Sequence, residues 1–200
     1  IEPRPQGRTI GYGAVYQNGE PCAEIFQERI REREILSGVS TMARTIDPDP
    51  EIALLGRKIL GTLDWNGPVM IEFLRTKDSN KTLLVNIVGR LWGSVQLAIR
   101  AGIDVPYLCY CLAQGRPLPK GRTAQSGIRF RWMIGDFQQM CNRVLGSFDP
   151  YGGGVPGLRR LKSFVEFSDP RAVVKMAYDV MDFQDPMPFL FECQRELQDW

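Results

Sequence analysis

A predicted β-hairpin between residues 69 and 94 constrains the fold more than any other part of the sequence. Two apolar runs, VMIEFL and TLLVNIV, flank the polar segment TKDSNK, and this order predicts strand, loop and strand. If the loop is centred on Ser79, Glu72 lies directly opposite Asn86, because both are equally far from the centre. We therefore expect a sheet built around this pair.

Alternation along the two strands predicts which side chains share a face. One face would carry Ile71, Phe73, Val85 and Ile87. The other would carry Met70, Glu72, Leu74, Leu84, Asn86 and Val88, followed by Arg90 if the strand continues. Two interpretations are open. Glu72 and Asn86 could hold a hard cation through oxygen while Arg90 contacts a phosphate, or they could form an exposed polar pair.

A second hairpin is predicted near the start of the chain. Residues 11–16 and 21–31 have strand patterns, and Asn18-Gly19 between them is a turn signal. The return strand ends in three alternating arginines, Arg29, Arg31 and Arg33. They would place three guanidinium groups on one face if the strand persists, or they would belong to a solvated edge strand of alternating charge.

A small-residue loop and several helices complete the predicted elements. The loop LSGVST, residues 36–41, offers backbone N–H groups to an anion. Helical spacing over residues 51–63 predicts a core helix with acidic residues at its start, and further helices are predicted after residue 95 and from Pro106 to Gly115. A polar linker starts at Arg116, which divides the chain into residues 1–115 and a helical, loop-rich extension over 116–200.

The composition excludes several classes of function. The chain has 200 residues, 25 basic and 23 acidic side chains and no histidine, so it lacks the residue for Ser-His or Cys-His catalysis and the commonest zinc ligand. The net charge of +2 gives no sign of nucleic-acid binding. The five cysteines lack framework spacing, and no apolar run approaches the roughly 20 residues of a membrane span. We expect a soluble, cytoplasmic protein with reduced thiols.

The order of these elements resembles the ATP-grasp superfamily, in the branch related to carbamoyl-phosphate synthase and biotin carboxylase. The resemblance covers residues 1–115, and its most specific piece is GRLWGSVQLAIRAGID. The motifs RFRWMIGDF and YDVMDFQDPMPFL are similar to C-terminal extensions of uncharacterised members. The resemblance implies an α+β fold, in which helices pack on one face of an antiparallel sheet, and only the second half of the ATP-grasp domain.

The resemblance also implies an activity and a set of site residues. Such enzymes hold ATP between two halves with Mg²⁺ and join a carboxylate to an amine or thiol through an acyl phosphate. Carried over by position, the hinge glutamate is Glu2, the phosphate-facing arginines are Arg29 and Arg31, the metal-binding positions are Glu72 and Asn86, and the arginine at the phosphoryl group is Arg90. Arg31 and Arg90 are thus the implied catalytic residues, and a nucleotide and a small carboxylate are the implied ligands.

The sequence departs from the family pattern at the second metal position. Asn86 and Val88 stand where relatives show Glu-x-Asn. Losing one carboxylate about 4 Å from a cation forfeits about 4 kcal/mol per unit of cation charge, before desolvation is credited back. The preceding half would have to come from a missing N-terminal segment or a partner chain. The alternative to an incomplete ligase is therefore a non-catalytic ATP-grasp-like binding or assembly module with a degenerate metal site.

Overall fold

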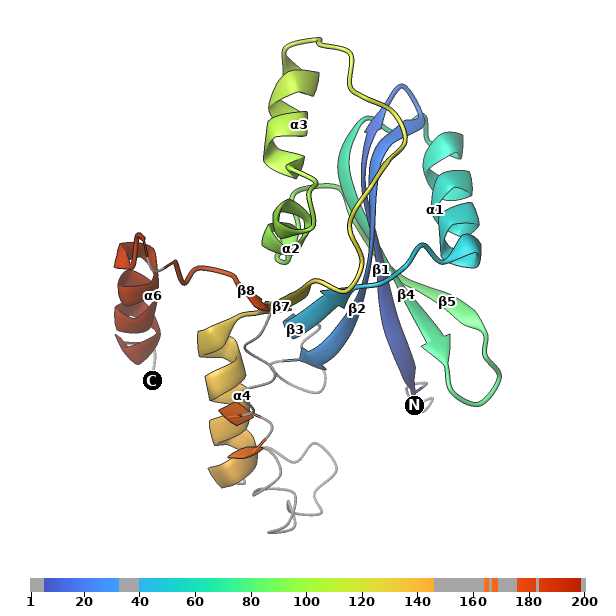
Figure 1. Ribbon diagram of the computed structural model, residues 1–200. Coiled ribbons are helices and arrows are strands. Elements are labelled where there is room, and N and C mark those ends of the chain that lie inside the picture. The colour runs from blue at the N-terminus through green and yellow to red at the C-terminus, as the bar shows by residue number, and fades with distance from the viewer. Residues whose placement is uncertain are drawn as a thin grey trace. The chain divides into compact units, whose positions relative to one another are not determined.

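The computed structural model describes residues 6–32, 40–145, 164–165, 167–168, 176–182 and 184–198 (Figure 1). The chain divides into two compact units. Unit 1 comprises Ile1–Arg29 and Ala43–Ile128, and unit 2 comprises Ile30–Met42 and Arg129–Trp200. Strands and helices alternate irregularly along the chain, so the predicted α+β class is confirmed.

The two predicted hairpins form the antiparallel centre of the sheet in unit 1. Strands β1 (Gly7–Gln17) and β2 (Glu20–Glu32) pair with each other, and β1 also pairs with β4 (Gly67–Thr76). Strand β5 (Thr82–Val88) pairs with β4 and ends the sheet. The β1–β2 turn uses Asn18 and Gly19 at positive φ, 53° and 72°, which is the conformation that this dipeptide adopts readily.

The remaining strands make the sheet mixed. The full order is β5-β4-β1-β2-β3-β7-β8, and β6 pairs with β2. The pairs β2–β6 and β7–β8 are parallel. The bounds of these strands are β3 Ser40–Thr45, β6 Arg122–Thr123, β7 Arg129–Arg131 and β8 Met176–Tyr178. Strands β2 and β3 contribute residues to both units.

Helix α1 (Pro50–Thr62) covers one face of the sheet in unit 1. Asp49 caps it by accepting hydrogen bonds from the backbone N–H groups of Glu51 and Ile52, as an N-cap carboxylate does. A Cβ added at Gly56 would lie 2.6 Å from the ring of Tyr12, so the helix approaches the sheet closely. The core beneath it consists of Ile10, Tyr12, Ala14, Tyr16, Phe26, Ile52, Leu60, Val69, Ile71 and Phe73.

Helices α2 (Val95–Arg100) and α3 (Val105–Ala113) lie on the opposite side of β1 and β4 from α1 (Figure 1). Gly13 marks this second face, because a Cβ there would meet Trp92 at 2.9 Å and Ile25 at 2.6 Å. In detail, therefore, helices cover both faces of the sheet rather than one. The reason is that the chain after β5 buries Trp92 against Gly13 of β1.

Unit 2 contains the predicted helices of the C-terminal extension. They are α4 (Met133–Leu145) and α6 (Met187–Gln198). Trp132 Nε1 donates to Glu192 at 2.8 Å, and Gln138 Nε2 donates to Glu196 at 2.7 Å, so hydrogen bonds tie α6 to α4 and to the residue before it. All five cysteines are free thiols. Within the described ranges, no helix has the length and apolar character needed to cross a membrane.

Candidate functional site

The central hairpin places Glu72 directly opposite Asn86, as the sequence predicts. The Asn86 amide nitrogen lies 3.4 Å from Glu72 Oε2 and donates to it. Both residues belong to a row of partners that crosses four strands, Gln27 on β2, Gly11 on β1, Glu72 on β4 and Asn86 on β5. The row lies on the face opposite α1, because its β1 member alternates with Ile10 and Tyr12 of the α1-facing core.

One predicted face assignment in this hairpin is wrong. The register shifts between Glu72 and Phe73, so that Phe73 pairs with Leu84 and Val85 has no partner on β4. Cross-strand partners share a face, and Leu84 therefore lies on the face of Phe73 instead of the face of Glu72. The extra residue is a β-bulge, which interrupts strict alternation in one strand only.

Arg29 on β2 forms an ion pair with Glu72 on β4, two strands away. Gly11 on the intervening strand β1 lies between Gln27 and Glu72. A Cβ at Gly11 would already be 2.9 Å from Met70 Sδ and 3.0 Å from Gln27 Cγ. The Arg29 and Glu72 side chains are only 14% and 18% exposed, so water screens this pair less than a surface pair.

These contacts do not fit the magnesium ion that the resemblance implies. Mg²⁺ prefers carboxylate oxygens and water in octahedral geometry, whereas Glu72 is neutralised by the Arg29 guanidinium and receives the amide of Asn86. In the described part of the chain, no group of three acidic, cysteine or histidine side chains could hold a metal ion. Glu72 and Asn86 therefore form a polar cluster with Arg29.

Arg90 does not join this cluster. Its Nη1 donates to the carbonyl of Leu91 at 2.8 Å, and no hydrogen bond links it to Glu72 or Asn86 within the described residues. The prediction that it shares their orientation requires the strand to continue, but β5 ends at Val88. Gly89 then lies against Trp65, where an added Cβ would be 2.7 Å from the indole ring.

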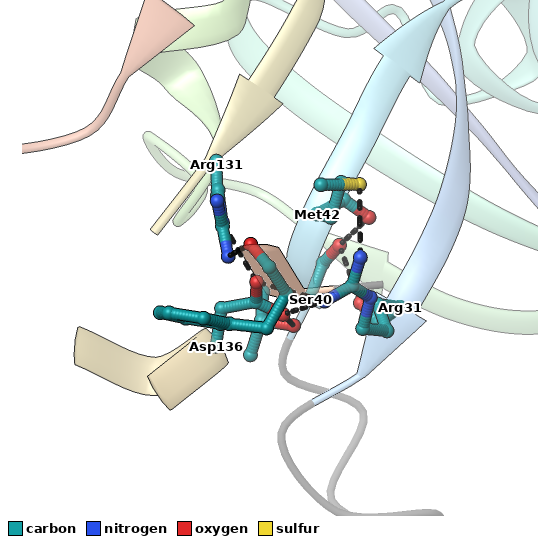
Figure 2. Close-up of polar contacts among 7 residues, drawn as sticks. Arg31, Ser40, Met42, Arg131 and Asp136 are labelled. Carbon is teal, nitrogen blue, oxygen red and sulfur yellow. Dashed lines mark hydrogen bonds and ion pairs between the residues drawn. The ribbon is translucent and has the colours of Figure 1, made fainter. Parts of the chain in front are cut away.

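Arg31 enters a different cluster, within unit 2 (Figure 2). Its Nη1 donates to both carboxylate oxygens of Asp136, each at 2.8 Å. Arg131 Nε donates to the same carboxylate at 2.7 Å, and the Thr41 hydroxyl donates at 3.2 Å. Asp136 is completely buried and Arg131 is 3% exposed. Figure 2 shows the two arginines approaching the carboxylate from β2 and β7.

The structure thus separates the two arginines that the sequence grouped together. Arg29 pairs with Glu72 in unit 1, and Arg31 pairs with Asp136 in unit 2. The ion pair between Arg131 and Asp136 was not predicted, although both residues belong to the motif RFRWMIGDF. Glu2, Arg33 and most of the LSGVST loop lie outside the described residues.

No protein-family model and no curated protein matches the sequence. Solved structures do match the fold. One is N5-carboxyaminoimidazole synthetase from Staphylococcus aureus complexed with ADP, with TM-score 0.50, 12% identity and coverage of 64% of this chain and 35% of that chain. Another is a multifunctional pyruvate carboxylase from Rhizobium etli, with TM-score 0.50, 15% identity and coverage of 62% and 13%. The present chain therefore spans about a third or less of the length of each.

Proposed function

From the ATP-grasp fold that this chain shares with these enzymes, we propose that it is a non-catalytic ATP-grasp-like binding or assembly module. The observation that carries the proposal is the ion pair between Arg29 and Glu72, completed by the Asn86 amide. In an ATP-grasp ligase this position would carry two acids and a metal. Here one acid, one amide and one internal cation give a net charge of zero, so the cluster offers a divalent cation almost no attraction.

The charges of Glu72, Asn86 and Arg29 support a module that binds no metal ion at this cluster. Each carboxylate charge that is missing or neutralised about 4 Å from a cation removes about 4 kcal/mol per unit of cation charge at an effective dielectric constant of ~20. One acid is replaced by Asn86 and the other is neutralised by Arg29. Nucleotide contacts, if they form on this face, would then depend on a second half-domain supplied by another part of the protein or by another chain.

A second candidate is the ligase activity itself. An exposed Arg90, two residues after the end of β5, favours it, because the guanidinium nitrogens that do not donate to Leu91 can contact a phosphoryl or substrate oxygen. This candidate requires ATP and Mg²⁺ as cofactors and a small carboxylate as substrate, with an acyl phosphate intermediate attacked by an amine or thiol. It also requires that Arg29 leave Glu72 when the metal arrives.

Manganese titration distinguishes the two candidates, because Mn²⁺ replaces Mg²⁺ at oxygen sites and its electron paramagnetic resonance signal reports the free ion. The wild-type chain is expected to leave the Mn²⁺ signal unchanged, with or without ATP. The variant Arg29→Gln/Asn86→Asp removes the internal cation and restores the second acid, and it is expected to bind Mn²⁺. Arg100→Gln/Asn80→Asp is the matched control, since both positions are exposed. Binding of Mn²⁺ by the wild type that Glu72→Gln abolishes would favour the ligase.

A further inference from the structure

A polar cavity of about 530 Å³ opens on the α1 side of the sheet in unit 1. Arg8 on β1 and Arg44 on β3 line it, together with Asp47 and the start of α1 at Pro50. The cavity lies on the opposite face from the Arg29–Glu72 cluster. Glu28 on β2 pairs with both cavity arginines. Its neighbour in the strand is Arg29, and adjacent residues of a strand point to opposite faces.

A buried carboxylate holds the two arginines in place. Glu28 is 7% exposed, and its two oxygens pair with Arg8 and with Arg44 separately. Each arginine uses its Nε atom for this contact. The terminal amino groups of both guanidiniums therefore have no acceptor among the described residues, and the two side chains are 50% and 45% exposed.

Acidic and basic side chains balance at the cavity, because Arg8 and Arg44 are matched by Glu28 and Asp47. Asp49 also lines the cavity, but it pairs with Arg75 at 2.8 Å, and Arg75 pairs with Glu51 at 2.9 Å. Among the described residues, Glu28 is the acid that pairs with Arg8 and Arg44, and the terminal amino groups of both guanidiniums stay available to a ligand. One buried acid thus holds two guanidinium groups at the cavity. Such a pair can bind a planar or tetrahedral oxyanion through paired hydrogen bonds.

We propose that this cavity binds a small anionic compound through Arg8 and Arg44, with a phosphate or carboxylate group between the two guanidinium forks. Asp47, which also lines the cavity and is exposed, accepts a hydrogen bond from a donor group elsewhere on the ligand. The site is separate from the face that carries Glu72, so its occupancy does not depend on whether the chain is a ligase or a non-catalytic module.

Isothermal titration of the full chain with inorganic phosphate, and in parallel with succinate, tests the proposal at constant ionic strength. At least one of the two probes is expected to bind, and the comparison shows which oxyanion the forks prefer. Arg44→Gln is expected to weaken binding by roughly tenfold or more, because charged hydrogen bonds are lost. Arg100→Gln, which removes the same charge from an exposed position outside the cavity, is expected to bind as the wild type does.

Two further variants distinguish loss of the anion site from misfolding and from a general effect of charge. Arg8→Gln removes the other fork and should repeat the loss, with far-UV circular dichroism confirming that each variant folds. Asp47→Asn removes an acid from the cavity and should tighten phosphate binding by about twofold. The proposal is overturned if neither probe binds the wild type, or if Arg44→Gln and Arg100→Gln weaken binding equally.

Discussion

Replacing Asp136 with asparagine tests how unit 2 is held together. The carboxylate is fully buried and accepts hydrogen bonds from Arg31, Arg131 and Thr41. Asparagine has nearly the same shape, so the change removes the charge without creating a cavity. Arg131 is 3% exposed and the Arg31 side chain is 14% exposed, and both guanidiniums would lose the anion that compensates their desolvation.

The expected loss of stability follows from these contacts. Hydrogen bonds to a charged group contribute about 1.5–3 kcal/mol each, and removing one partner of a buried ion pair costs about 3–5 kcal/mol in total. Because Arg131 also donates to the carbonyl of Phe167 at 3.0 Å and stacks on its ring at 4.3 Å, part of its environment survives. We therefore expect Asp136→Asn to lower the free energy of unfolding by about 4 kcal/mol.

Urea unfolding followed by tryptophan fluorescence measures this loss, since Trp132 follows Arg131 directly in the chain. Asp78→Asn, at an exposed loop position, is the control and should change the stability by less than about 0.5 kcal/mol. A double-mutant cycle with Arg31→Gln should give a coupling energy of about 1–3 kcal/mol. A loss below about 1 kcal/mol for Asp136→Asn, or no coupling to Arg31, would refute the inference that this cluster stabilises the unit.

Three other substitutions probe packing and titration. Gly56→Ala should destabilise the chain by about 1–3 kcal/mol, because the new Cβ would meet the Tyr12 ring at 2.6 Å. Gly61→Ala in the same helix meets nothing within 4 Å and should stabilise the chain. Thermal unfolding of both variants measures the two effects, and equal effects would contradict the close packing of Gly56 on Tyr12. Burial and the nearby Glu192 raise the pKa of Asp179 to about 6. The folded state then binds a proton that the unfolded state releases near pH 4, so this group's contribution to stability falls as the pH rises from about 4 to 6. Asp179→Asn should remove that decline and be more stable than the wild type at pH 7 by up to about 3 kcal/mol; an unchanged pH profile of the melting temperature would refute it.

Local sequence patterns were enough to predict the two hairpins. Both combine a polar turn with apolar runs of period two, and the turn fixes the register close to it. In the central hairpin the pairs nearest the turn, Arg75–Thr82 to Phe73–Leu84, are one residue off the register centred on Ser79, and a bulge at Val85 brings Glu72 opposite Asn86 as predicted. The prediction failed for Leu84, because a bulge adds one residue to β5 and single-residue insertions leave no mark on an apolar run.

The ion pairs of the candidate site could not be predicted in the same way. Arg29 on β2 pairs with Glu72 on β4 across the intervening strand β1. The pairing of Arg31 with Asp136 joins residues 105 positions apart. Neither contact follows from periodicity or turn chemistry, since each depends on the order of strands in the sheet. The assignment of domains to residues 1–115 and 116–200 stays a prediction.

The alternation of charge along β2 has a consequence for how the sheet finds its alignment. Glu28 pairs with Arg8 and Arg44 on one face of the sheet, and its neighbour Arg29 pairs with Glu72 on the other face. If β2 slipped by a single residue, the acid would face Glu72 and the arginine would face Arg8 and Arg44, so that like charges would meet on both surfaces at once. Misaligned versions of this strand are thus penalised electrostatically as well as by exposure of apolar groups, and the chain rejects them without any contribution from a bound ligand.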